Sequence, residues 1–116
     1  MQTLRIEHPI SDYALWRRAF DAVAEARTEA GVRAHRVHRP ADDDHYVLVD
    51  LDFDTVEHAT AFLGFLRTRV WSSPTSSPAL VGEPVTRVLS VEVDAPDSDS
   101  YVAPSRRTLV PGDRGA

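Results

Sequence analysis

Three residue types are missing from this chain: cysteine, lysine and asparagine. Without cysteine there can be no disulfide, no thiolate nucleophile and no cysteine-ligated metal. All 13 basic residues are arginine, which we interpret as the base composition of a GC-rich genome rather than as a functional signal. The start of the chain has no apolar signal segment, and no run is long enough to span a membrane. We therefore expect a cytoplasmic protein without a membrane partner.

The residues that are present fit one small globular domain. The chain has 116 residues, and 42% of them are hydrophobic, which is enough for a buried core. A domain of this size buries only about 60–70% of its unfolded surface, so pairing with a second copy would add stability. The formal net charge of −5 argues against a nucleic acid partner.

The stretch 45–71 contains a strand that runs into a helix. Alternate residues over 47–53 are apolar, and this period of two indicates a strand with two unlike faces. Beyond this strand, apolar residues recur every three or four positions over 56–70, which is typical of an amphipathic helix. We expect Asp54 to cap that helix together with Glu57.

Alternation predicts two further strands, over 3–8 and 85–93. We expect another strand over 32–39, where alternation is poor, because the polar turn over 40–44 would join it to the strand over 47–53 as a hairpin. Three-and-four spacing predicts another helix over 13–30, which Gly31 would end. The resulting order is β-α-β-β-α-β, the split-βαβ arrangement. It predicts an α+β protomer with a four-stranded antiparallel sheet and both helices on one face.

The chain loses its periodicity after residue 93, where proline, serine and glycine become frequent. We therefore expect one domain over 1–93 and a flexible tail over 94–116. The stretch 72–84 is rich in serine and proline and is predicted to be a loop, which could act as a lid.

The face of the sheet away from the helices is predicted to mix charged and apolar side chains. Pairing Val37 with Val47 in the hairpin of the two middle strands places Ala34, Arg36 and His38 on the face of Leu48 and Asp50. We expect Val88 of the last strand to lie on this face as well. A register shifted by one residue would instead place Arg33 and His35 there. Such a face has too many apolar side chains to be exposed to water and too many charged side chains to form an apolar core. We expect it to pack on a second copy and to enclose a cavity between the two sheets.

Several short motifs carry a resemblance to a known family. They are HPISDY at 8–13 with Trp16 and Phe20, DDD at 42–44, FD at 53–54, AFL at 61–63, LR at 66–67, VW at 70–71 and GEP at 82–84. With these motifs the chain resembles, over 3–93, the antibiotic-biosynthesis-monooxygenase-like branch of the dimeric α/β-barrel superfamily. The resemblance implies a ferredoxin-like protomer, a homodimer and a cavity between the sheets. Members include cofactor-independent monooxygenases acting on polyketides, polyketide cyclases and haem-degrading enzymes.

The chain departs from the characterised members of that family. Their quinone-forming oxygenases and haem degraders rely on an asparagine, and this chain has none. We therefore carry over no catalytic residue and expect neither haem degradation nor a bound cofactor. The mixed face and the resemblance favour a small cofactor-independent enzyme, of monooxygenase or cyclase type, acting on a hydrophobic polyketide-like molecule. The missing asparagine favours the alternative, a non-catalytic dimeric binding or accessory protein.

Two titratable residues are the predicted catalytic groups. Asp50 lies in the middle of a strand, where burial would raise its pKa and suit it to general acid or base chemistry. The alternative is a salt bridge to Arg36 or Arg87 that only fixes the dimer. His8 ends the first strand, where it could line the mouth of the cavity and titrate near neutral pH. Its alternative is a hydrogen bond that holds the turn into the helix.

The predicted substrate-binding residues are Arg36, His38, Tyr46, Leu48 and Trp71. Tyr46 and Trp71 would form aromatic walls, and Arg36 would stabilise an enolate. Trp71 could equally anchor the loop that follows it in the core. His35 and His38 are three residues apart on a strand and so point to opposite faces, which argues against a metal site.

Overall fold

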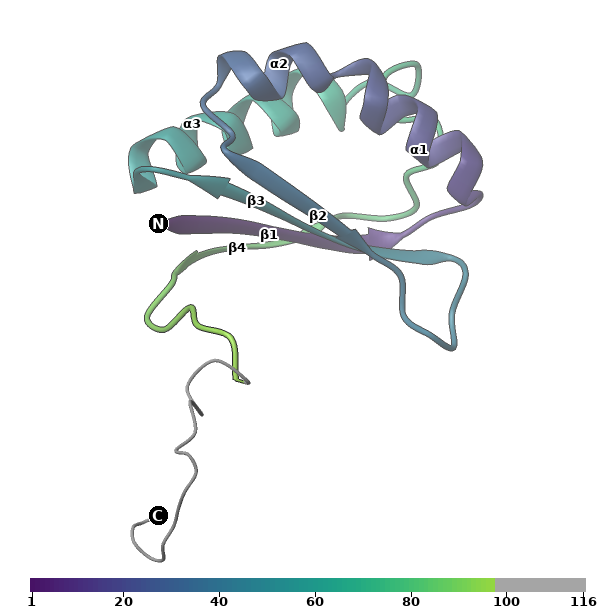
Figure 1. Cartoon of the computed structure of the whole chain (residues 1–116). Helices are drawn as coiled ribbons and strands as arrows, with labels where there is room; N and C mark the ends of the chain where they lie inside the picture. The colour runs from purple at the N-terminus through teal and green to yellow at the C-terminus, as the bar shows by residue number, and fades with distance from the viewer. Residues whose placement is uncertain (98–116) are drawn as a thin grey trace, which may run out of the picture.

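The computed structural model describes residues 1–97, and the part of the predicted tail from residue 98 onward lies outside the described residues. The element order β-α-β-β-α-β is confirmed, with the first helix in two segments and a π-helical turn, η1, after the second (Figure 1). The elements are β1 (Gln2–Pro9), α1 (Tyr13–Ala22), α2 (Ala24–Glu29), β2 (Ala34–His38), β3 (Tyr46–Phe53), α3 (Val56–Phe65), η1 (Leu66–Val70) and β4 (Val85–Ser90).

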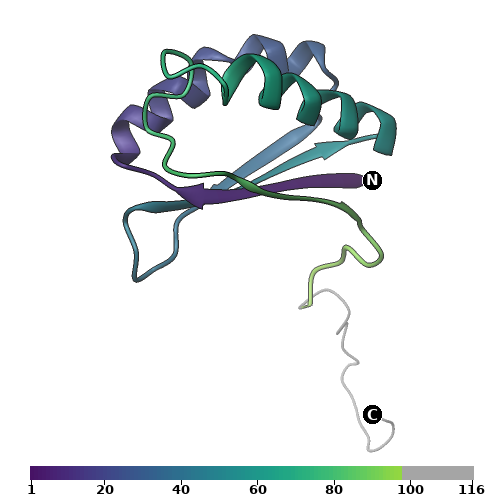
Figure 2. The ribbon, with the colours of Figure 1, turned by 180° about the vertical axis from the view of Figure 1, so that it is seen from behind.

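The four strands form one antiparallel sheet in the order β2-β3-β1-β4. All the helices cover one face of the sheet and leave the other face bare, as two opposite views show (Figures 1 and 2). This is the predicted α+β ferredoxin-like arrangement, which is therefore confirmed. We call the uncovered side the bare face. It carries Thr3, Arg5, Glu7, Arg36, His38, Tyr46, Leu48, Asp50, Asp52, Arg87 and Leu89.

The register of the β2–β3 hairpin differs from the prediction by two residues. Val37 lies opposite Val49, not Val47. Because a shift of two residues keeps every side chain on its own face, Arg36 and His38 still share the bare face with Asp50. The predicted pairing is therefore wrong, but the predicted face is right.

Strand β4 corrects one predicted member of the bare face. Val88 lies opposite Leu4 and packs against the core under the helices. Its neighbours Arg87 and Leu89 point to the bare face instead. Alternation in β4 could not settle which face is buried, because apolar residues occupy both of its faces.

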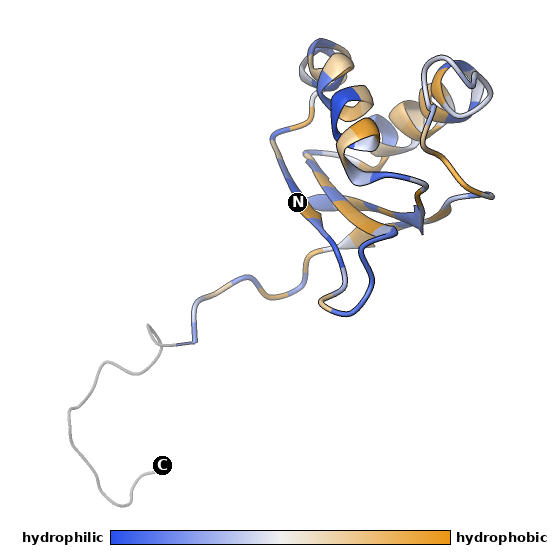
Figure 3. Cartoon of the chain, turned by 90° about the vertical axis from the view of Figure 1, so that its right-hand side faces the viewer, coloured by the Kyte–Doolittle hydropathy of each residue, from blue (hydrophilic) through white to orange (hydrophobic). Residues whose placement is uncertain are grey.

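The hydrophobic core lies between the sheet and the helices, and apolar segments of both layers face one another there (Figure 3). Its sheet side consists mainly of Leu4, Ile6, Val47, Val49, Leu51 and Phe53, all of them buried. Ala59, Phe62 and Leu63 of α3 pack onto this layer. Burial of one such large side chain stabilises the fold by about 1.5–3 kcal/mol.

The helix starts are set by side-chain caps. Asp12 caps α1 by accepting a hydrogen bond from the Leu15 N–H at 2.9 Å, as its place after β1 suggests. The α3 cap is Thr55, whose hydroxyl accepts from the His58 N–H at 3.1 Å. The predicted Asp54 cap is thus wrong by one residue, since Thr55 has the extended backbone that a cap requires.

The predicted helix over 13–30 divides at Val23, where the backbone leaves the helical region before α2 begins. Gly31 follows α2 with a φ of 93°, the left-handed conformation expected of a residue that ends a helix. No helix within residues 1–97 combines the length and the apolar character needed to cross a bilayer.

Candidate functional site

A cavity lies between the sheet and the helices, on the side opposite the bare face. Its volume is about 70 Å³, and it opens to solvent at its mouth. Its wall is mostly apolar and includes four aromatic residues, Trp16, Phe20, Phe62 and Trp71. The polar residues among its lining are His8, Arg27, Ser76 and Ser77. An apolar pocket with few polar groups is the usual form of a small-molecule site.

Helix α1 supplies one aromatic wall of the cavity. Trp16 and Phe20 lie one turn apart, and their rings stack with centroids 5.0 Å apart. Tyr13 extends the stack by a further turn, at 5.8 Å from Trp16. Trp16 is buried as a core anchor, as its spacing predicts, and it also faces the cavity. The apolar side of α1 thus contributes both to the hydrophobic core and to the wall of the cavity.

The π-helical turn η1 brings Trp71 to the cavity. The Trp71 N–H donates to the Leu66 carbonyl at 2.7 Å, a bond over five residues instead of four. The wider turn adds a residue and so rotates the residues that follow it, and Leu66, Val70 and Trp71 all line the cavity. Trp71 is therefore a cavity wall, but of this cavity and not of one between two sheets. Wide turns of this kind occur often at functional sites.

The serine-rich loop closes one side of the cavity. Ser77 donates from its hydroxyl to the Val70 carbonyl at 2.9 Å, and it lines the cavity together with Ser76. Leu80 pairs with Ile10 just beyond β1, so the loop is fastened beside the strand end that carries His8. Its predicted action as a lid stays a prediction.

His8 is a buried base in the lining of the cavity. Its side chain lies on the face of β1 that the helices cover, and only 4% of its surface is exposed. Nδ1 lies 2.9 Å from the Pro9 carbonyl oxygen. A carbonyl only accepts hydrogen bonds, so Nδ1 must carry the ring proton and Nε2 has the free lone pair. Burial lowers the pKa of His8, and the bond to Pro9 only partly opposes this.

Nε2 of His8 has no hydrogen-bond partner among residues 1–97, while the ring lines the cavity. Both sequence interpretations of His8 therefore have a counterpart in the structure. Nδ1 holds the turn after β1, and the rest of the ring faces the cavity. A neutral imidazole with an unbonded Nε2 can accept a proton from a bound molecule.

Arg27 is a cavity residue that sequence reasoning missed. Its guanidinium lies 3.7 Å from the centre of the Phe20 ring and donates from Nη1 to the Phe20 carbonyl. Only 6% of Arg27 is exposed, and burial lowers its pKa, with the charge of Asp21 partly opposing the shift. The sequence signal for a buried cation was the position of Arg27 in the apolar stripe of the helix predicted over 13–30, because a charged residue in that stripe must be buried.

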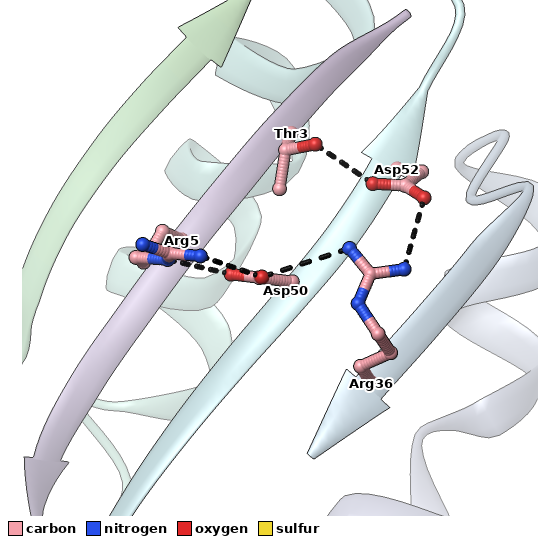
Figure 4. Close-up of polar contacts among 5 residues, drawn as sticks. All are labelled: Thr3, Arg5, Arg36, Asp50 and Asp52. Carbon is pink, nitrogen blue, oxygen red and sulfur yellow. Dashed lines mark hydrogen bonds and ion pairs between the residues drawn. The ribbon is translucent and has the colours of Figure 1, made fainter. Parts of the chain in front are cut away.

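The bare face carries a network of ion pairs across three strands (Figure 4). Asp50 accepts two hydrogen bonds from Arg5, at 2.8 and 2.9 Å, and lies 3.6 Å from Arg36. Arg36 also pairs with Asp52 at 3.5 Å, and Asp52 accepts from the Thr3 hydroxyl at 2.8 Å. The Arg5 hydrogen bond holds the pKa of Asp50 below its usual value, despite its burial.

The expected rise in the pKa of Asp50 is therefore wrong, because Arg5 and Arg36 favour the ionised form more than burial opposes it. Its catalytic role stays a prediction, and these contacts favour the salt-bridge alternative. The salt-bridge alternative predicted Arg36 correctly as a partner of Asp50, but it did not include Arg5, which is the main partner. Arg87 lies beside Arg5 in β4 and makes no ion pair with Asp50.

The structure separates the predicted site residues into two groups. His8 and Trp71 line the cavity on the helix side. The other five lie on the bare face: Arg36, His38, Tyr46, Leu48 and Asp50. The Tyr46 hydroxyl donates to Glu7 at 2.8 Å. The two predicted catalytic residues, His8 and Asp50, thus lie on opposite faces of the sheet and cannot act on one ligand from within a single protomer.

Comparisons with known proteins place the fold. No protein-family model matches the chain, and no curated protein matches it either. Among solved structures, SnoaB, a cofactor-independent oxygenase from Streptomyces nogalater, aligns with a TM-score of 0.62 and 18% identity, over 83% of this chain and 97% of its own. A dimeric ferredoxin-like protein from an uncultured marine organism aligns with a TM-score of 0.58 and 11% identity, over 81% and 97%.

A third similar structure is a monooxygenase from the gene ActVA-Orf6 of Streptomyces coelicolor, in complex with the ligand nanaomycin D. It aligns with a TM-score of 0.55 and 16% identity, over 83% of this chain and 92% of its own. At these identities the likeness shows a shared fold. The ferredoxin-like fold implied by the sequence resemblance is therefore confirmed.

Proposed function

We propose that this chain is a small cofactor-independent enzyme of the monooxygenase type. Its substrate is a flat, hydrophobic, polyketide-like molecule held in the cavity between the helices and the sheet. The observation that carries the proposal is His8, a buried neutral imidazole whose unbonded Nε2 belongs to an aromatic-walled cavity. Two oxygenases of the same fold, SnoaB and the Streptomyces coelicolor enzyme, support the choice of reaction.

The residues around His8 suit a reaction that begins with loss of a proton. Trp16 and Trp71 would hold the rings of the substrate by stacking. Nε2 of His8 would remove a proton from a carbon or hydroxyl acidified by a neighbouring aromatic ketone. The resulting electron-rich anion can react directly with O₂, so the substrate itself supplies the electrons. A mainly apolar cavity keeps water away from this anion.

We also propose that two copies pair through the bare face. Leu48 and Leu89 on this face are half-buried, and Val85 at its edge is 59% exposed, so apolar surface remains there for a partner. The similar marine protein is described as dimeric, which supports the pairing. The Asp50 network would then lie within the dimer and hold the strands that form the contact.

Oxidation of anthrone tests the catalytic proposal. Its acidic CH₂ group loses two hydrogens and gains one oxygen atom of O₂, the other oxygen leaves as water, and the product is anthraquinone. The wild-type protein should form anthraquinone and consume O₂ in equal amounts. His8→Gln should slow the reaction by about 100-fold or more, the usual loss for a general base. His45→Gln, in the exposed turn between β2 and β3, is the matched control and should react as the wild type does.

Ligand binding separates catalysis from mere binding. Trp16 and Trp71 are the two tryptophans of the chain, and both line the cavity, so their fluorescence reports its occupancy. Nanaomycin D, the ligand of the Streptomyces coelicolor enzyme, should quench this fluorescence with a saturable curve. Binding of aromatic ligands without any anthrone turnover would support the alternative, a non-catalytic binding protein. An equal rate for His8→Gln and wild type would contradict the role of His8.

A further inference from the structure

Arg27 is a buried cation without a carboxylate partner. Only 6% of its surface is exposed, and no Asp or Glu of residues 1–97 makes an ion pair with it. The charge of Asp21 favours the charged form of Arg27, but the Asp21 carboxylate forms its ion pair with Arg17. Buried charges in proteins are as a rule paired, because removal from water strongly disfavours a lone ion.

The guanidinium of Arg27 also has hydrogen-bonding capacity left over. An arginine presents five N–H donors in a planar fork. One nitrogen of Arg27 donates to the Phe20 carbonyl, and the ring of Phe20 lies under the guanidinium. The other donors have no acceptor among residues 1–97, and the side chain lines the cavity. These donors are therefore available to a molecule that occupies the cavity.

Arg27 and His8 line the same cavity from different elements, α2 and β1. The Phe20 ring beneath Arg27 contacts the ring of His35, with centroids 5.4 Å apart. His35 pairs with Leu51, four residues along β3 from the partner of His8, Val47. Four residues of a strand span roughly 13 Å. We therefore expect a ligand that contacts both Arg27 and His8 to be elongated over a similar span.

We propose that Arg27 binds a carboxylate on the ligand of this cavity, so that the substrate is an elongated aromatic acid. The planar fork of an arginine matches the two oxygens of a carboxylate. With the acid at Arg27, the far ring of the molecule lies beside Nε2 of His8. This inference rests on the proposed function in one respect, the presence of an aromatic ligand in the cavity.

The charge of the whole protein cannot produce the same preference. The net charge is −5, so the long-range field repels an anion. An affinity for carboxylates must then come from a local cation. Because a buried pair is screened by salt much less than a surface pair, the preference should also persist at high ionic strength.

Two probes of equal shape test the inference: anthracene-2-carboxylate and its neutral analogue anthracene-2-carboxamide. Binding of each is read from tryptophan fluorescence. The wild type should bind the carboxylate at least about tenfold more tightly, as expected for a hydrogen bond to a charged group. Arg27→Met keeps an apolar stem and loses the charge, so it should bind both probes equally. Arg18→Met removes an arginine from the exposed side of α1 and should keep the wild-type preference.

Arg27→Lys covers the case in which Arg27→Met does not fold. It keeps the charge but not the fork, so it should retain a reduced preference for the carboxylate. Equal binding of the two probes by the wild type would overturn the inference about Arg27 and leave the cavity as a ligand site. A preference that survives in Arg27→Met would overturn it as well. Failure of both probes to bind the wild type would instead overturn the proposed function.

Discussion

Replacement of Asp50 by alanine removes the carboxylate that joins β1, β2 and β3 on the bare face. Its two hydrogen bonds to Arg5 are charge-assisted, and such bonds contribute about 1.5–3 kcal/mol. The Arg36 contact at 3.6 Å involves a half-exposed side chain and contributes little. Arg5 is also 46% exposed, so it regains water after the substitution, and the loss stays below the 3–5 kcal/mol of a fully buried pair. We expect Asp50→Ala to lower the free energy of unfolding by about 2 kcal/mol, or the Tm by about 10 °C.

Urea unfolding of wild type, Asp50→Ala, Arg5→Ala and the double variant measures this pair directly. The double-mutant cycle should give a coupling of about 1.5 kcal/mol between Arg5 and Asp50. The Arg5 bond lowers the pKa of Asp50, so its stabilisation is complete above the ordinary pKa of 3.8 and is lost as the pH falls through the lower folded-state value. Asp42→Ala, in the exposed turn, is the control and should unfold as the wild type does.

Two results would refute this reasoning. A change of less than about 0.5 kcal/mol for Asp50→Ala, the size usual for surface substitutions, would mean that the network does not hold the strands. A folded Asp50→Ala protein that binds aromatic probes but has lost anthrone turnover would instead make Asp50 a catalytic residue. We expect this variant, where folded, to keep the turnover of the wild type.

Three further predictions concern other parts of the molecule. Burial lowers the pKa of His8 below 6.5, so the stability of the wild type should fall as the pH drops below 6.5. The Tm of His8→Gln, measured by thermal unfolding, should fall less over the same pH range. Equal losses of Tm in the two proteins would contradict this prediction. Gly31→Ala places a side chain at a φ of 93°, which should cost about 1–2 kcal/mol in urea unfolding; an unchanged midpoint would show that the turn relaxes. Leu48→Asp puts a charge on the bare face, so sedimentation should show a dimer for wild type and a monomer for the variant, whereas a wild-type monomer would remove the proposed pairing.

The layers of this fold could be predicted because the periodicity is clear in the strand over 47–53 and in both helices, although it is weak in the strands over 32–39 and 85–93. Alternation over 47–53 and the stripes of both helices identify which residues meet in the core. The division of the first helix at Val23 had no such signal, since neither proline nor glycine occurs there. The π-helical turn Leu66–Val70 likewise has no sequence mark, because its hydrogen bonds depend on how the following loop packs.

The site was harder to predict, because alternation defines two faces without saying which of them borders a cavity. The charge of Asp50 drew attention to the bare face, where Arg5 in fact neutralises it. The space on the helix side depends on how far the tryptophan side chains hold the helices from the sheet, which is a property of tertiary packing. Arg27 could have been found, since a charged residue within an apolar helix stripe signals a buried cation.

The most direct test of the account is a crystal structure of the protein with anthracene-2-carboxylate, grown at a concentration that saturates the fluorescence titration. We predict that its rings lie between Trp16, Trp71 and the sheet, with one end beside Nε2 of His8 and the carboxylate on Arg27. Rings bound on the bare face beside Asp50, with the space under the helices unfilled by ligand, would contradict the account.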